Sequence, residues 1–343
     1  MKQQLKVAML RVLRDAGAPI GSAQIAEDIR LYGIDLGPRS VRLRLKELAA
    51  EGLVAESRRG RGGGRTITEK GIAEIGDALV RDRVGFASAK IDSLACRTTF
   101  DPATATGDVV LNLSTAHASL IRPVLREMLP VFASGFCMGR YVRVFEPGTR
   151  IGQFTVPSGK VAIGTVCSVT VNGVLLSRGI PMVSKFGGIL EVRNRQLLRF
   201  TDVIYYESTS LDPLTVFIKG GLTSMENICR TGSGRVGASF REVPTCMLPL
   251  VKKTLDQLQS LGLGCVLTIG KPNRPLLGFP VSEGRTGLVL CGGLNPLAAV
   301  EQSGVSPGNS AMAEIFDFAK LETYTDLAER FDVELTTGSD DRQ

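Results

Sequence analysis

The sequence predicts an α+β protein in which an N-terminal winged helix-turn-helix precedes an internally duplicated α+β domain. Three observations lead to this prediction. Helical patterns and then a hairpin pattern follow one another in the first 70 residues. That stretch holds 14 basic and 8 acidic residues, against 27 and 26 in the rest of the chain, so nearly all of the net charge of +7 lies there. Short motifs further along recur at an offset of about 125 residues.

The composition argues against several classes of protein. With 43% hydrophobic and 22% charged residues, the chain is typical of a soluble globular protein. No uncharged apolar run approaches the roughly 20 residues that span a bilayer. The seven cysteines form no C-x-x-C pair and His117 is the single histidine, which argues against metal sites and histidine-based hydrolases. The N-terminus has no signal-peptide pattern, so we expect a cytoplasmic protein without membrane contact, metal or cofactor.

The first 70 residues match the order of a winged helix-turn-helix. Three stretches carry apolar side chains at helical spacing and are separated by glycine or proline: 5–13, 22–29 and 38–48. In the third stretch Val41, Leu45 and Leu48 share one side, and basic residues occupy the other. Two short strand-like segments follow, 53–57 and 66–68, and the loop between them is rich in arginine and glycine. These features predict a recognition helix and a basic wing.

This basic surface favours binding to double-stranded DNA. A helix fits the major groove, and a flexible basic wing can reach phosphates or the minor groove. The expected contacts are Arg39, Ser40, Arg42, Arg44, Lys46, Arg58, Arg59, Arg61 and Arg65. Each feature also has a simpler interpretation. A charged helix face is commonly just exposed to solvent, and an arginine- and glycine-rich loop can be a disordered linker. Both features in this order favour a DNA-binding domain over residues 1–70.

Residues 71–98 are expected to form a connector. Apolar residues at helical spacing predict either one long helix or two helices joined at Gly85. Such a segment either packs on the following domain or transmits a signal within a dimer. Because regulators with this head commonly bind two-fold symmetric sites, we expect a homodimer and a palindromic operator.

The body, residues 99–330, contains the internal repeat. Pro147, Phe154 and Asn172 match Pro272, Phe279 and Asn295 at offsets of 125, 125 and 123 residues. The two halves span about 107–180 and 234–305, and a polar tail covers 331–343. Two related α+β halves commonly leave a cleft, and clefts between repeats are frequent ligand sites.

Polar residues near the ends of equivalent apolar strands are the candidates for binding a small effector in such a cleft. They are Thr165, Cys167, Ser168, Lys185, Gly292, Gly293 and Asn295. Glycine at 292 and 293 would allow backbone N–H groups to approach an anion. Each stretch also fits a plain structural turn. The run from Gly232 to Gly237 matches G-x-G-x-x-G, but it follows a helical segment and precedes a strand, the reverse of a dinucleotide site.

At this level of detail the chain resembles the NrpR family, nitrogen-regulatory repressors of methanogenic archaea and their bacterial relatives. The resemblance lies in VAIGTVCSVTVNGVLL at 161–176, GIP at 179–181, KFGG at 185–188, TSLDP at 209–213, GGLNP at 292–296, GPRSVR at 37–42 and ITEKG at 67–71. It implies a dimeric repressor that senses nitrogen status, with 2-oxoglutarate as the effector. Some family members carry two effector domains, whereas this chain has one.

The sequence therefore favours a transcriptional repressor, of nitrogen-assimilation genes by the resemblance, whose DNA affinity is set by a small metabolite. Two alternatives remain at this point. One is a DNA-tethered enzyme that acts on a small polar metabolite, although the chain shows no acid–base constellation for it. The other is a constitutive nucleoid protein without an effector.

Overall fold

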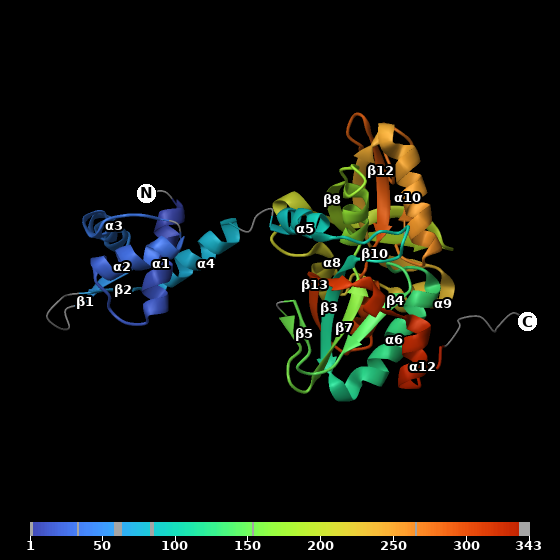
Figure 1. Cartoon of the computed structure of the whole chain (residues 1–343), viewed down its shortest axis with the longest axis horizontal. Helices are drawn as coiled ribbons and strands as arrows, with labels where there is room; N and C mark the ends of the chain where they lie inside the picture. Colours follow the sequence, from blue (N-terminus) through green and yellow to red (C-terminus); the bar gives the residue numbers. More distant parts are fainter. Residues whose placement is uncertain are drawn as a thin grey trace, which may run out of the picture. The chain divides into compact units, whose positions relative to one another are not determined.

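The structure is a computed structural model that describes residues 3–32, 34–57, 64–82, 86–152, 154–264 and 266–335 (Figure 1). The chain divides into two compact units, residues 1–84 and 85–343. We call them the head and the body. Each has its own hydrophobic core.

The head is a winged helix-turn-helix. Its elements are α1 (Gln3–Ala16), α2 (Ser22–Asp28), η1 (Ile29–Tyr32), α3 (Pro38–Ala50), β1 (Val54–Ser57), β2 (Gly64–Ile67) and α4 (Glu69–Asp82). The strands β1 and β2 pair antiparallel, and Ile20 adds a bridge to Arg65. Met9, Ile25, Val41 and Leu48 are fully buried among the helices. The predicted order of three helices and a hairpin is therefore confirmed.

The expected connector is divided between the two units. It forms two helices, α4 and α5 (Phe86–Arg97), rather than one. The helix α4 belongs to the head, because Ile75 is buried in the head core and Glu74 forms an ion pair of 2.9 Å with Lys6 on α1. The helix α5 belongs to the body, where Ile91 and Leu94 are buried. The division therefore lies between Val84 and Gly85, not at residue 70.

The body contains two five-stranded sheets. Its first part comprises β3 (Asp108–His117), η2 (Ala118–Leu120), α6 (Ile121–Ser134), β4 (Tyr141–Phe145), β5 (Arg150–Ile151), β6 (Phe154–Thr155), β7 (Lys160–Val166), α7 (Val169–Leu176), β8 (Val183–Arg193) and β9 (Gln196–Tyr205). Next come η3 (Tyr206–Ser208), α8 (Pro213–Lys219) and α9 (Met225–Thr231). The last part comprises β10 (Gly234–Pro244), η4 (Thr245–Met247), α10 (Leu248–Ser260), β11 (Val266–Ile269), β12 (Arg285–Cys291), α11 (Asn295–Gln302), β13 (Gly308–Asp317), η5 (Phe318–Lys320), β14 (Glu322–Thr323) and α12 (Tyr324–Phe331).

The sequence repeat corresponds to a repeated strand arrangement. The neighbours β3, β7 and β4 in one sheet match β10, β12 and β11 in the other. The register matches as well: Asn112 pairs with Thr165, and Ala238 pairs with Cys291, each residue 126 positions later. The helices α6 and α7 of the first copy correspond to α10 and α11 of the second.

The two copies exchange a strand reciprocally. The strand β8 follows α7 of the first copy but pairs with β10 of the second. The strand β13 follows α11 of the second copy but pairs with β3 of the first. The resulting orders are β13-β3-β7-β4-β14 and β11-β12-β10-β8-β9. Each sheet is therefore completed by the other copy, and the halves expected at 107–180 and 234–305 do not form separate lobes.

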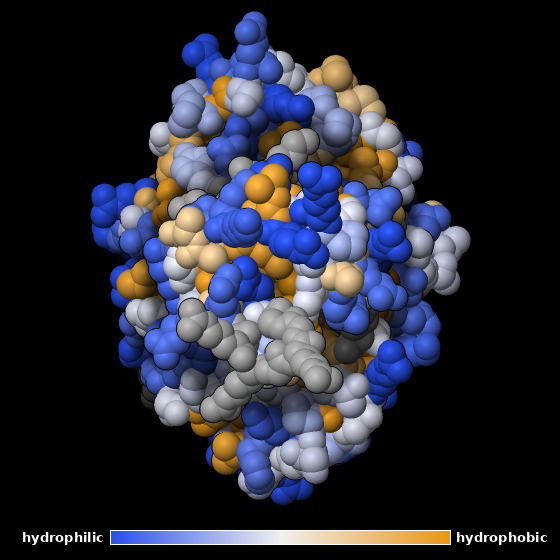
Figure 2. Space-filling view, turned by 90° about the vertical axis from the view of Figure 1, so that its left-hand side faces the viewer, coloured by the Kyte–Doolittle hydropathy of each residue, from blue (hydrophilic) through white to orange (hydrophobic). Residues whose placement is uncertain are grey.

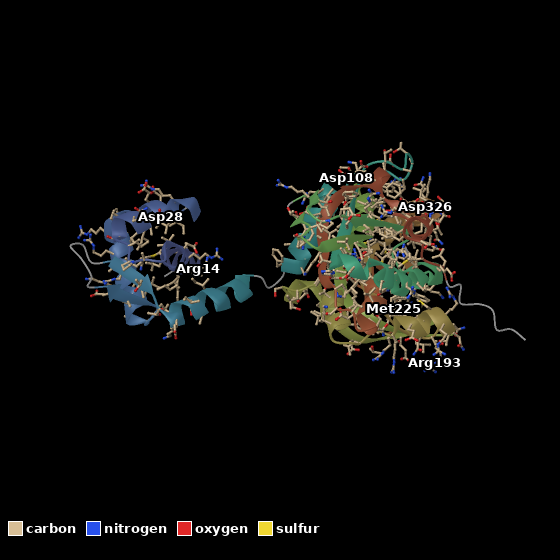
Figure 3. The ribbon with its side chains drawn as sticks, turned by 90° about the horizontal axis from the view of Figure 1, so that it is seen from below. Arg14, Asp28, Asp108, Arg193, Met225 and Asp326 are labelled. Atoms are coloured by element: carbon tan, nitrogen blue, oxygen red, sulfur yellow. The ribbon has the colours of Figure 1, made fainter. Side chains whose placement is uncertain are left out.

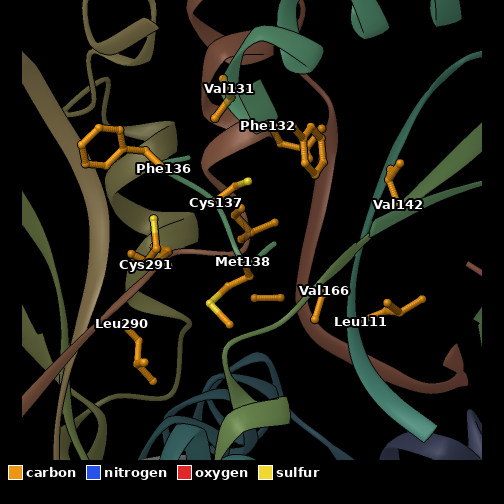
Figure 4. Packing of buried hydrophobic residues seen from close by; sticks show 14 of the residues in the cluster. Leu111, Val131, Phe132, Phe136, Cys137, Met138, Val142, Val166, Leu290 and Cys291 are labelled. Carbon is orange, nitrogen blue, oxygen red and sulfur yellow. The ribbon is translucent and has the colours of Figure 1, made fainter. Parts of the chain in front are cut away.

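A continuous core joins the two sheets. Figure 4 shows Phe136, Cys137 and Met138 between Val166 of the first sheet and Leu290 of the second. All five residues are buried. Charged side chains such as Arg193 project outward from the body, whereas Met225 is fully buried (Figure 3). The body is thus one packed unit.

The helices α5 and α7 approach closely at Gly173. A Cβ added at Gly173 would overlap the Cβ of Thr98 at the end of α5, and it would lie 2.8 Å from the carbonyl oxygen of Ala95. No side chain fits this contact without a backbone shift. Gly173 therefore holds α5 against the body.

We expect Gly173→Ala to destabilise the body by about 1–3 kcal/mol, because overpacking outweighs the gain of up to about 1 kcal/mol that alanine gives inside a helix. Thermal unfolding monitored by circular dichroism measures the change. The control is Gly220→Ala at the end of α8, where the nearest atom to an added Cβ lies 3.3 Å away. A gain in stability from Gly173→Ala would contradict the close approach.

Candidate functional site

The recognition helix α3 presents a basic outer face. Gly37 precedes the helix with φ −71° and ψ 158°, and Pro38 occupies its first turn, where a missing N–H costs no hydrogen bond. Val41 and Leu45 point into the head core. The exposed side chains are Arg39, Ser40, Arg42, Leu43 and Lys46. This face can enter a major groove.

Two predicted contacts are engaged within the head. Arg44 is half-buried and forms an ion pair of 2.7 Å with Glu47 one turn along α3. Arg65 on β2 forms an ion pair with Glu56 on β1. Both are therefore less available to a phosphate than Arg39 or Arg42. The predicted contacts Arg58, Arg59 and Arg61 lie outside the described residues.

Figure 2 shows one face of the molecule, on which strongly hydrophilic side chains surround small hydrophobic patches. Leu43 is an exposed apolar side chain on α3, with 57% of its surface accessible. Its position beside Arg42 and Arg44 in the helix leaves it available for contact with a thymine methyl group.

The body contains a buried arginine that no sequence argument singled out. Arg241 on β10 is 1% exposed. Its Nη2 donates to Ser168 Oγ at 2.7 Å, its Nε donates to Ser239 Oγ at 3.3 Å, and its Nη1 lies 3.9 Å from Met182 Sδ. Among the described residues, no carboxylate oxygen lies within 4.0 Å of the guanidinium. The guanidinium is therefore hydrogen-bonded only by neutral groups, two hydroxyls and a thioether sulfur, among the described residues, an expensive arrangement for a buried cation.

Arg241 lines a small chamber of about 20 Å³ between the two sheets. The ends of β7 and β12 meet there, because a Cβ added at Gly293 would overlap the carbonyl oxygen of Val166. The other polar lining residues are Asn112, Cys167, Ser168, Tyr206 and Asp212. Asn112 is held by accepting a hydrogen bond of 3.0 Å from the backbone N–H of Met312. The helix α5 closes the chamber with Ile91.

Burial disfavours the charged form of every ionisable group in this chamber, so each pKa moves in the direction that favours the neutral form. It raises the pKa of the Cys167 thiol to about 11, although the nearby Arg241 charge opposes the shift. Burial also raises the pKa of Tyr206 and of Asp212 and lowers the pKa of Arg241. Asp212 caps α8, where its carboxylate accepts from the N–H of Thr215 at 2.7 Å. The chamber thus contains one guanidinium and one carboxyl group, and the carboxyl group is engaged in capping α8.

A larger outer pocket of about 500 Å³ adjoins the chamber. The two share Asp212, Ala311 and Met312 as lining residues. Lys90 of α5 lines the outer pocket and donates to the carbonyl oxygen of Ala311 at 3.2 Å. Within the described ranges, no carboxylate oxygen lies within 4.0 Å of Lys90. Lys219, by contrast, is paired with Glu301 at 2.7 Å.

The structure brings together only part of the predicted effector site. Cys167, Ser168 and Gly293 line the chamber. Thr165 is buried beside it, where its Oγ1 lies 3.5 Å from the Nδ2 donor of Asn112. Lys185 lines a different pocket.

Gly292 and Asn295 do not line the chamber; they form hydrogen bonds with the backbone around them. The N–H of Gly292 donates to the carbonyl oxygen of Gly237 at 2.9 Å. The Asn295 amide accepts from the N–H of Gly237 and donates to the carbonyl oxygens of Gly237 and Phe136, each at 3.0 Å. These contacts agree with the alternative given for this stretch in the sequence analysis, a structural turn without a ligand. Arg241, Asn112, Tyr206 and Asp212 were not among the predicted effector contacts, although Asp212 lies in the TSLDP stretch at 209–213. Arg241 gave no distinct signal, because charged residues also occur beside it at 235 and 242.

Comparison with known proteins identifies the family. Residues 84–323 match the model of the NrpR regulatory domains NRD1 and 2. The chain belongs to the NrpR family. Residues 7–75 match the ribonuclease R winged-helix domain, which agrees with the fold of the head.

Individual relatives support the assignment to the NrpR family. The global nitrogen regulator NrpRI of Methanosarcina mazei is 34% identical over 316 residues, which cover 92% of this chain and 96% of the relative. The global nitrogen regulator NrpR of Methanococcus maripaludis is 30% identical over 330 residues, 95% of this chain but 56% of that protein. A nitrogen repressor-like protein from Methanococcus jannaschii has a crystal structure that superposes with a TM-score of 0.60 at 27% identity, over 69% of this chain and 98% of that one.

These names confirm the expectation of a nitrogen-regulatory protein and not an enzyme, so the DNA-tethered enzyme is not retained. Across the described residues, no helix combines the length and the apolar character needed to span a membrane.

We expect Cys167 to resist alkylation in the folded protein, because with a pKa of about 11 roughly one thiol in a thousand is ionised at pH 8 and the thiolate is the reactive form. Iodoacetamide treatment followed by peptide mass spectrometry measures this. Cys96 and Cys246 are exposed and serve as internal controls. Modification of Cys167 at the rate of Cys96 would show that the chamber opens freely to solvent.

Proposed function

We propose that this chain is a transcriptional repressor of nitrogen-assimilation genes that binds a palindromic operator as a homodimer. We further propose that its affinity for DNA is set by 2-oxoglutarate bound between the chamber and the outer pocket. The names of its relatives support the regulatory role. The exposed basic face of α3 supports DNA binding, and the unpaired buried Arg241 supports an anionic effector.

The single observation that most favours an anionic effector is the environment of Arg241. A buried guanidinium with no carboxylate oxygen within 4.0 Å is stabilised when a ligand carboxylate enters and accepts its N–H groups, because charge-assisted hydrogen bonds are the strongest available to it. Ser168 Oγ and Asn112 Nδ2 offer further polar contacts at the chamber wall. Lys90, which also has no carboxylate partner among the described residues, provides a second cation in the adjoining pocket. Two cations at two depths suit a dicarboxylate.

The duplication supports one effector site per chain. The position 126 residues before Arg241 is Thr115, which carries no charge. In the second copy the turn after β12 is closed by the hydrogen bonds of Asn295 to Gly237 and Phe136. Both turns line the chamber, through Ser168 and Gly293, but among the described residues only the first hydrogen-bonds to the cation, through Ser168 Oγ.

The helix α5 is the element through which occupancy of the site would reach the head. It begins directly after the boundary between the two units. Ile91 lines the chamber and Lys90 lines the outer pocket, so one helix contacts both parts of the site. A ligand shifts a conformational equilibrium only through contacts that differ between the two states. Lys90 offers such a contact, since it would exchange the carbonyl oxygen of Ala311 for a ligand carboxylate.

We expect Arg42→Ala to weaken binding to an operator by about 1–3 kcal/mol if Arg42 contacts a base edge. Filter binding on an operator duplex and on a random duplex measures both losses. Arg14→Ala on α1 is the control, because Arg14 is paired with Asp15. Equal losses on the two duplexes would show that Arg42 contacts only phosphate, and no loss would remove α3 from the interface.

We expect Arg241→Met to weaken 2-oxoglutarate binding by about 30-fold or more, since loss of a buried charge partner costs about 2 kcal/mol or more. Calorimetry measures the affinity, and a gel shift on the gene's own promoter with and without 2-oxoglutarate measures the response. The fold should tolerate the change, because Arg241 has no ion-pair partner among the described residues and its loss therefore leaves no paired carboxylate uncompensated.

The control variant is Arg199→Met, whose side chain is 71% exposed on β9. In the absence of 2-oxoglutarate, Arg241→Met should bind the promoter as the unaltered protein does. A full response to 2-oxoglutarate in Arg241→Met would overturn the proposed site. A protein that binds DNA with no response to 2-oxoglutarate at all would instead favour a constitutive nucleoid protein.

A further inference from the structure

A separate pocket, of about 260 Å³, lies on the opposite face of the second sheet from Arg241. Successive side chains of a strand point to opposite faces, so Phe240 and Glu242 face away from the chamber that their neighbour Arg241 lines. The pocket is lined by Lys185, Phe186, Phe240, Glu242, Phe279 and Val281, among others. We call it the aromatic pocket. The proposed effector site uses none of these residues.

A buried carboxylate faces the aromatic pocket. Glu242 is 1% exposed, and its Oε1 accepts a hydrogen bond of 3.0 Å from the backbone N–H of Ser282. Its Oε2 has no hydrogen-bond partner among the described residues, and none of their basic nitrogens lies within 4.0 Å of the carboxylate. Glu242 lines the pocket, so a cationic group that enters the pocket can contact its carboxylate in a charge-assisted hydrogen bond.

A β-bulge brings a cation to the same pocket. Phe186 pairs with Phe240, but the next pair is Ser184 with Arg241, so Lys185 is the extra residue of the bulge. Bulges re-aim a side chain that would otherwise follow the alternation of the strand. Here the bulge places Lys185 beside Phe186 on the pocket wall. Lys185 is half-buried and has no carboxylate partner within 4.0 Å in the described part of the chain.

Aromatic rings form the rest of the wall. The rings of Phe186 and Phe240 stack with centroids 5.1 Å apart, and Phe279 packs on Phe186 at 4.6 Å. These rings bury apolar groups, and ring faces also attract a cationic ammonium group. The pocket therefore combines an anion, a cation and an apolar surface.

We propose that the aromatic pocket binds a free α-amino acid with an apolar side chain. Glu242 Oε2 accepts the ammonium group, Lys185 pairs with the carboxylate, and the side chain packs on Phe279 and Val281. The opposite charges of a zwitterion match Glu242 and Lys185 individually, whereas a dicarboxylate would meet the buried charge of Glu242. This site is independent of the one around Arg241, so the protein would sense an amino acid as well as an organic acid.

The test uses the full-length protein with L-leucine and L-phenylalanine as probes. Calorimetry should detect binding of at least one of them, and Glu242→Gln and Lys185→Met should each weaken it by about tenfold or more, the equivalent of 1.4 kcal/mol. Glu146→Gln and Lys252→Met, both at exposed positions, are the matched controls and should bind as the unaltered protein does. Thermal unfolding of each variant without ligand shows whether it is folded.

Analogues of leucine test the role of each charge. 4-Methylpentanoate lacks the ammonium group and 3-methylbutylamine lacks the carboxylate, so each should bind about tenfold more weakly than leucine. Equal binding of leucine and either analogue would overturn the proposal. So would the absence of binding of both amino acids at about 10 mM, or binding that neither Glu242→Gln nor Lys185→Met weakens. Arg241→Met should leave amino-acid binding unchanged, which separates this site from the proposed effector site.

Discussion

The reciprocal exchange of β8 and β13 is the constraint on which the body depends. Each strand leaves its own copy of the repeat and completes the sheet of the other copy. The exchange places the ends of β7 and β12 against each other, so that Gly293 touches the backbone of Val166. It also brings Arg241, from the second copy, onto Ser168, from the first, at 2.7 Å. The chamber exists because the copies are interlocked rather than merely adjacent.

The same arrangement accounts for two dissimilar pockets around one strand. In β10, Arg241 faces the junction of the two sheets, and Phe240 and Glu242 face the opposite side. The pairing with β8 is regular up to Phe240 and then shifts by one residue at Lys185. Because of this bulge, the side chain of Lys185 does not follow the alternation of β8 and lies at the aromatic pocket. This pair of strands thus supplies Arg241 to the chamber and Lys185 and Glu242 to the aromatic pocket.

The sequence predicted the head well because its signals are local. Apolar spacing within each helix and the position of the charge are readable without knowledge of the tertiary structure. The boundary after residue 70 was less accurate, since α4 joins the head through contacts of Ile75 and Glu74 with α1.

The repeat was also readable, but the exchange was not, because pairing of β8 with β10 leaves no local pattern. Arg241 was missed for a related reason: a charge within a strand resembles a solvent-facing residue until both faces are known to be covered. Lys185 was grouped with residues that line a different pocket, because a bulge cannot be read from alternation.

The exchanged strands also set the order in which the chain can fold during synthesis. Asp108 begins the strand β3, and its partner in the sheet is Asp317 on β13. The first sheet therefore cannot be completed until nearly the whole body has left the ribosome. Until then β3 has one unpaired edge, of the kind that other chains can extend. Contacts this distant in sequence also slow folding. The head has no such dependence, so a winged helix able to fold early would precede a body that must wait for its last strand.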